Sequence, residues 1–150
     1  MHANNEIGNL IDLETIGSLI HQHEALFHTD TVQTMGHIRL DLSVLPVDFL
    51  VGSAHKFNGP KGVGFLYINH RHKINPFING GAQERNMRGG TENVYGIVGL
   101  AKALEIAYAE LEEQKMQILK LKKHMIDELI KKIPDVQFNG QCADLDHSLC

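Results

Sequence analysis

Residues 47–68 read VDFLVGSAHKFNGPKGVGFLYI, and this stretch decides the fold class. Two apolar runs within it, Val47–Gly52 and Gly62–Ile68, have the length and composition of short buried strands. The connection between them is rich in glycine and proline and contains Lys56. A further short buried strand is predicted at residues 25–28. Helices that alternate with such strands indicate an α/β fold.

The remainder of the chain is predicted to form helices and one long loop. An amphipathic helix follows Asp12, which is a good capping residue. Residues 74–93 contain four glycines and two arginines without a clear period, which is typical of a functional loop. Residues 92–132 have a helical pattern that is expected to break near residues 112–114. Residues 136–140 are predicted to begin another strand.

Composition excludes several classes of protein. The net charge of −4 argues against nucleic-acid binding, which needs a clustered basic surface. No apolar run approaches the ~18 residues of a membrane span. The two cysteines are too few for a disulfide framework, and no secretory leader is visible. We therefore expect a soluble, cytoplasmic protein in a reducing environment.

Polar side chains follow two of the predicted strands. Asp30 follows one strand and Lys56 follows another, and reactive groups of α/β sheets lie in loops beyond the strand ends. A suitably placed lysine amine forms Schiff bases. Pyridoxal phosphate (PLP) enzymes need such a lysine, a carboxylate for the ring nitrogen, and hydroxyl or N–H groups for the phosphate. Asp30, Ser53, His55 and Lys56 would supply these groups.

Each of these residues also has an ordinary structural explanation. Lys56 could be a surface lysine, Asp30 a capping residue, Ser53 a turn residue and His55 a partly buried histidine. Ten histidines invite a metal site, and two groups of them cluster in the sequence: His21/His23/His28 and His70/His72. Neither group has a convincing ligand spacing with a third partner. No metal is predicted.

Four sequence blocks occur in an order that resembles a known family. They are MHANNEIG (1–8), LFHTDTVQ (26–33), SAHKFNGPKGVGFLYI (53–68) and GGAQERNMRGGTEN (80–93). Together they resemble the NifS/IscS-like cysteine desulfurases of the class V aminotransferase family, which have the type I PLP-enzyme fold. The resemblance runs from Met1 to about Tyr108.

The resemblance implies a fold and a domain division. Residues 1–110 would be the central part of the large PLP-binding domain, with a mostly parallel sheet flanked by helices. Residues 111–150 would be a long linking helix and the incomplete start of the small C-terminal domain. The chain is therefore expected to be a fragment of a longer protein.

The resemblance also implies roles for individual residues around the cofactor. Lys56 resembles the Schiff-base lysine, and Asp30 resembles the carboxylate that binds the pyridine nitrogen. Gln33 resembles the residue that hydrogen-bonds the phenolic oxygen. Ser53 and His55 resemble phosphate ligands.

Two further residues match positions at the edge of the family's site. Asn5 resembles a residue near the cofactor and the substrate carboxylate. Thr91 resembles a threonine that reaches the phosphate bound by the neighbouring subunit. The second match implies a homodimer with shared active sites.

Family members remove sulfur from L-cysteine, releasing L-alanine and leaving a persulfide on an enzyme cysteine. The sulfur then passes to an acceptor such as an iron–sulfur scaffold protein. Neither Cys142 nor Cys150 lies in the family's nucleophile motif, and both are expected to be ordinary thiols. The nucleophile is thus expected outside this chain, and the fragment alone is expected to be inactive.

Two other interpretations remain open from the sequence. The parent protein could be another class V PLP enzyme, a selenocysteine lyase or an aminotransferase. The chain could also be a non-catalytic scaffold that only dimerises, although the presence of Asp30, Gln33 and Lys56 argues against this.

Overall fold

The computed structural model describes residues 1–145 and residue 149. Its regular elements are, in chain order, α1 (Leu13–Gln22), β1 (His28–Asp30), β2 (Phe49–Ser53), the short 3-10 helix η1 (Ala54–Phe57), β3 (Gly64–Ile68), α2 (Gln83–Asn86), α3 (Val94–Ala109) and α4 (Leu111–Lys132). The α/β class predicted from the sequence is therefore confirmed.

The sheet has the order β1-β2-β3. Strand β1 is parallel to β2, with Asp30 opposite Val51, whereas β2 is antiparallel to β3. The prediction of a mostly parallel sheet is therefore wrong for the described residues. The reason is the short connection at residues 54–63, because a parallel pair needs a crossover of about a dozen residues or more. The longer segment at residues 31–48 allows β1 and β2 to be parallel.

Helix α1 begins where the sequence predicts. The Asp12 carboxylate accepts hydrogen bonds from the main-chain N–H groups of Glu14 and Thr15, which satisfies two donors of the first turn. Gly17 faces the rest of the protein, and a Cβ at this position would lie only 2.4 Å from the carbonyl oxygen of Pro46. A glycine here lets the helix pack closely against the segment that leads into β2.

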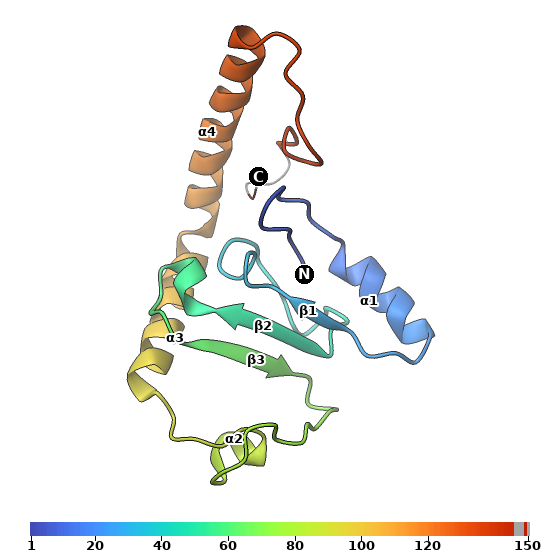
Figure 1. The fold of residues 1–150 in the computed structure, drawn as a ribbon, viewed down its shortest axis with the longest axis vertical. Helices are drawn as coiled ribbons and strands as arrows, with labels where there is room; N and C mark the ends of the chain where they lie inside the picture. The colour runs from blue at the N-terminus through green and yellow to red at the C-terminus, as the bar shows by residue number, and fades with distance from the viewer. Residues whose placement is uncertain (146–148, 150) are drawn as a thin grey trace.

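The predicted long helix is divided in two. Helix α3 ends at Ala109 and α4 begins at Leu111, so the expected break lies slightly earlier than residues 112–114. Helix α3 lies beside the sheet, and α4 continues from it well beyond the strands (Figure 1). Among the described residues, no helix is both long enough and apolar enough to cross a membrane.

The strand predicted at residues 136–140 does not form, so this prediction is wrong. The segment has no strand partner among residues 1–145 and instead returns to the N-terminal part of the chain (Figure 1). The side chain of Gln141 accepts a hydrogen bond from the Leu10 N–H at 2.7 Å, and the Gln141 N–H donates to Asn9 Oδ1 at 2.9 Å. An isolated extended segment is not stable without a neighbouring strand.

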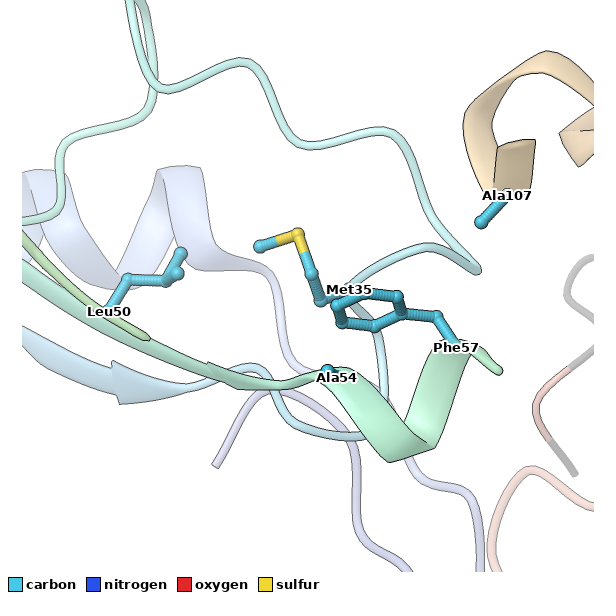
Figure 2. Packing of buried hydrophobic residues seen from close by; sticks show 5 residues of the cluster. All are labelled: Met35, Leu50, Ala54, Phe57 and Ala107. Carbon is cyan, nitrogen blue, oxygen red and sulfur yellow. The ribbon is translucent and has the colours of Figure 1, made fainter. Parts of the chain in front are cut away.

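One hydrophobic cluster holds the strand ends together. It joins the turn after β1, strand β2, η1 and α3 through five buried residues: Met35, Leu50, Ala54, Phe57 and Ala107 (Figure 2). Gly36 in the same turn has φ +81°, and a Cβ there would lie 2.7 Å from Cβ of Phe57. Only glycine allows this close approach, which fixes the turn after β1 directly against η1.

Candidate cofactor site

Asp30 and Lys56 lie at the same edge of the sheet. Asp30 is the last residue of β1, and Lys56 belongs to η1, which directly follows the last residue of β2. Because β1 and β2 are parallel neighbours, their carboxyl ends meet at one edge. The acid and the amine therefore follow adjacent strand ends, in the arrangement that the sequence predicts.

Main-chain hydrogen bonds fix the position of Asp30. Its Oδ1 accepts from the Val32 N–H at 2.8 Å, and its carbonyl oxygen accepts from the His2 N–H at 2.7 Å. The hydroxyl of the next residue, Thr31, donates to the Val51 carbonyl at 2.7 Å. The main chain at the half-buried Asp30 is thus bonded to the N-terminal segment, and the next residue is bonded to β2.

Ser53 and His55 form a polar pair beside Lys56. The Ser53 hydroxyl lies 2.9 Å from His55 Nδ1, and Ser53 makes no side-chain capping hydrogen bond to η1. Ser53 lies two residues beyond Val51, so it shares a sheet face with Asp30. The two Cα atoms are separated by about 4.8 Å across the strands and about 6.7 Å along them.

Lys56 has an exposed side chain on a main chain held by several contacts. Helix η1 ends at Phe57 and is capped by Asn58, which has φ 63°, and the Gly59 N–H donates to the Ala54 carbonyl at 2.8 Å. The neighbouring Phe57 is fully buried. The Lys56 carbonyl accepts from His37 Nε2 at 2.9 Å. The lysine is therefore presented to solvent from a fixed backbone.

The remaining three predicted site residues lie in loops outside the two strand ends. Gln33 is half-buried in the turn after β1. Asn5 lies in an exposed turn, where its Nδ2 donates to Glu6 Oε1 at 2.9 Å, and the bond from His2 to Asp30 anchors this turn beside β1. Thr91 is exposed in the loop before α3 and, within the described part of the chain, makes no hydrogen bond to the strand-end residues.

The chemistry of these groups fits PLP. Asp30, Ser53, His55 and Lys56 bring a carboxylate, a hydroxyl–imidazole pair and an amine to the residues at and just after the ends of β1 and β2, and Gln33 adds an amide in the turn after β1. PLP requires an amine for its aldehyde, an anion for its ring nitrogen and short donors for its phosphate. The residues present can therefore hold this cofactor.

A cavity elsewhere in the described residues is a separate feature. It has a volume of about 590 Å³ and lies between β3, the loop before α3, and α3 itself, with Leu66, Phe77 and Ile97 among its apolar walls. None of the predicted site residues lines it. The cavity gives no support to the cofactor site.

Two structural features were missed by the sequence interpretation. His37, with its bond to Lys56, belongs to no motif and is distant from Lys56 in sequence. The second feature is Asp48, the residue before β2, whose side chain is 3% exposed. Its carboxylate oxygens lie 2.9 Å from His21 Nε2 and 2.5 Å from His72 Nε2. Asp48 thus contacts one histidine from each of the two clusters in the sequence, His21 and His72.

The Asp48 carboxylate is strongly stabilised in its charged form. Burial alone would raise the pKa of Asp48. Hydrogen bonds from the Phe27 N–H and from the imidazoles of His21 and His72 more than offset burial and lower the pKa to about 2. Among the described residues, no three histidine, cysteine, aspartate or glutamate side chains are arranged to hold a metal ion. Through its contacts with His21 and His72, Asp48 connects α1 and the segment after β3 to the residue that leads into β2.

Cys142 differs from the prediction. It is disulfide-bonded, so the expected ordinary thiol is wrong at this position. Cysteine content indicates a redox environment but does not reveal whether a given sulfur atom is bonded in the folded chain. The corresponding prediction for Cys150 lies outside the described residues.

Comparison with known sequences identifies the family of this chain. The family model described as aminotransferase class-V matches residues 1–150. The chain is 49% identical over 140 residues to cysteine desulfurase IscS of Dictyoglomus turgidum, which covers 93% of this chain and 36% of that protein. It is 50% identical to cysteine desulfurase IscS of Methanosarcina thermophila, covering 93% and 34%. The chain thus spans about a third of the length of these curated relatives.

Solved structures show the same similarity. A NifS-like protein matches with a TM-score of 0.83 and 46% identity, covering 87% of this chain and 36% of that one. DndA from Streptomyces lividans matches with a TM-score of 0.84 and 31% identity, covering 99% and 42%. Together with the family model that matches its whole length, these similarities show that the chain belongs to the class V aminotransferase family.

Proposed function

We propose that the protein containing these residues is a PLP-dependent cysteine desulfurase. It would convert L-cysteine into L-alanine and leave the sulfur as a persulfide on a cysteine outside this chain. The observation that carries this proposal is the placement of Asp30 and Lys56 after two parallel neighbouring strands, in a chain 49% identical to a cysteine desulfurase.

Lys56 and Asp30 would perform the central steps. When bound, PLP supplies an electron sink that weakens the bonds at the substrate α-carbon. Lys56 binds the cofactor aldehyde and moves protons at the α-carbon, for which its exposed amine on a fixed backbone is suited. Asp30, held by the Val32 N–H, keeps a proton on the ring nitrogen because an anion there favours the cationic ring.

The neighbouring polar residues would orient the cofactor. The hydroxyl–imidazole pair of Ser53 and His55 supplies hydrogen bonds to the phosphate. Gln33 donates to the phenolic oxygen without adding charge. Asn5 would lie near the substrate carboxylate. Thr91 would reach the phosphate bound by a second subunit, so we propose a homodimer.

The proposal extends to partners and to the domain division. The persulfide sulfur would pass to an acceptor such as an iron–sulfur scaffold protein. Residues 1–110 would belong to the large cofactor-binding domain, and residues 111–150 would lead into the small one. The low cysteine content supports a cytoplasmic location, whereas the disulfide of Cys142 is the observation that opposes it.

Product analysis with the complete polypeptide that contains residues 1–150 tests the proposal. Supplied with PLP, L-cysteine and an excess of a dithiol, it should release alanine and sulfide in equal amounts, because the dithiol reduces the persulfide. D-cysteine is the matched control and should give neither product. Absence of alanine from L-cysteine would contradict the proposal.

The same assay separates the alternatives. Turnover of L-selenocysteine without turnover of L-cysteine would assign a selenocysteine lyase, and amino-group exchange with a keto acid would assign an aminotransferase. No turnover, together with no borohydride-stable cofactor adduct, would assign a non-catalytic scaffold.

A further inference from the structure

His37 forms the polar link between the two turns that carry the proposed cofactor residues. It lies in the turn after β1, whereas its Nε2 is 2.9 Å from the main-chain carbonyl oxygen of Lys56 in η1. A carbonyl oxygen is only an acceptor, so Nε2 must carry the hydrogen. This holds for the neutral ring in one tautomer and for the charged ring. The link is therefore a hydrogen bond donated to the Lys56 peptide.

The turn that carries His37 is closed by main-chain hydrogen bonds. The N–H groups of Thr34 and Met35 donate to the Thr31 carbonyl, and those of His37 and Ile38 donate to the Thr34 carbonyl, all at 2.8–2.9 Å. These bonds run continuously from the residue after Asp30 to His37. The position of His37 is thus fixed relative to the Asp30 carboxylate.

Packing and hydrogen bonding have different roles at this contact. Met35 and Phe57 are 4% and 1% exposed and hold the two turns together by hydrophobic burial. The bond from His37 to Lys56, in contrast, lies at the surface. Removing this bond would leave the hydrophobic contact intact and would take away the side-chain hydrogen bond that holds the Lys56 peptide against the turn after β1.

We propose that His37 is a positioning residue that fixes the Lys56 peptide relative to the Asp30–Gln33 turn, so that amine and carboxylate meet one cofactor in a constant orientation. This inference rests on the proposed role of Lys56. It adds a residue that touches neither cofactor nor substrate and that acts only through the lysine main chain.

Two substitutions in the complete polypeptide test this role. His37→Leu removes the donor, whereas His37→Gln places an amide N–H near the position of Nε2. His124→Leu on the exposed surface of α4 is the matched control. The readouts are the equilibrium constant for linking PLP to Lys56, measured by absorbance and borohydride trapping, and the melting temperature.

His37→Leu should lower the linkage constant about three- to tenfold, which is the range expected for one net hydrogen bond. His37→Gln should restore it to within about twofold of the unsubstituted protein. The melting temperatures of both His37 variants should match that of His124→Leu.

Two results would overturn this inference and leave the proposed function standing. One is an unchanged linkage constant in His37→Leu. The other is a loss that follows the melting temperature and is not rescued by glutamine, since that pattern indicates a purely structural residue. If the unsubstituted protein forms no adduct at Lys56, the proposed function fails and this inference fails with it.

Discussion

Replacing Lys56 with alanine should abolish the borohydride-stable attachment of PLP and lower alanine formation from L-cysteine about 10²- to 10⁴-fold. The amine follows β2 directly and is held by a backbone whose carbonyl is bonded to His37. The substitution removes both the group that binds the cofactor aldehyde and the group that moves protons at the α-carbon. Mass spectrometry after borohydride treatment and an alanine assay measure the two effects.

Lys61→Ala is the matched control for this experiment. Lys61 is exposed in the same connection between β2 and β3 but lies beyond η1. The Lys61→Ala protein should keep both the cofactor adduct and the turnover of L-cysteine. An adduct that persists in Lys56→Ala, or one that disappears equally in Lys61→Ala, would refute the assignment of Lys56.

The second large effect is on stability. Asp48→Ala should lower the free energy of unfolding by about 3 kcal/mol, because it leaves a buried N–H and two imidazoles without their acceptor. The affected donors are the Phe27 N–H, at 2.8 Å, and the rings of His21 and His72. Urea denaturation of the complete polypeptide at neutral pH measures this loss. Asp127→Ala, an exposed carboxylate on α4, should have no comparable effect.

Asp48 also predicts a specific acid dependence. Its pKa is lowered from 3.8 to about 2 in the folded protein, with His21, His72 and Arg71 as the basic groups around it. A depressed carboxylate pKa stabilises the fold above the unfolded value and ceases to do so as the pH falls through the folded value. The contribution is about 2 kcal/mol above pH 5, and roughly half of it is lost by pH 3.

Asp48→Asn isolates this dependence, because asparagine keeps the shape but does not titrate. The free energy of unfolding of the unsubstituted protein should fall by about 1 kcal/mol more than that of Asp48→Asn between pH 5 and pH 3. Equal acid slopes for the two proteins would show that Asp48 does not stabilise the fold through its charge.

Local signals in the sequence predicted much of the fold. Asp12 caps α1 because a carboxylate at that position can reach the first free N–H groups. The strand ends at Asp30 and Ser53 lie close to where apolar runs give way to polar residues. The antiparallel β2–β3 pair was predictable as well, since the short connection at residues 54–63 excludes a parallel crossover.

Contacts between distant residues were not predictable in this way. The bond from His37 to Lys56 and the cluster of Asp48 with His21 and His72 join positions that no periodicity relates. They form because hydrophobic packing brings separate turns together, as with Met35 and Phe57. The prediction of a strand at residues 136–140 was wrong for a related reason. Strand formation depends on a neighbouring strand that the local sequence does not specify.

A crystal structure of the complete polypeptide with PLP tests the central claim most directly. The account predicts one cofactor covalently joined to Lys56 Nζ, with the Asp30 carboxylate hydrogen-bonded to its ring nitrogen, at the carboxyl ends of β1 and β2. A cofactor bound to another lysine, or a ring nitrogen that faces a group other than Asp30, would contradict it.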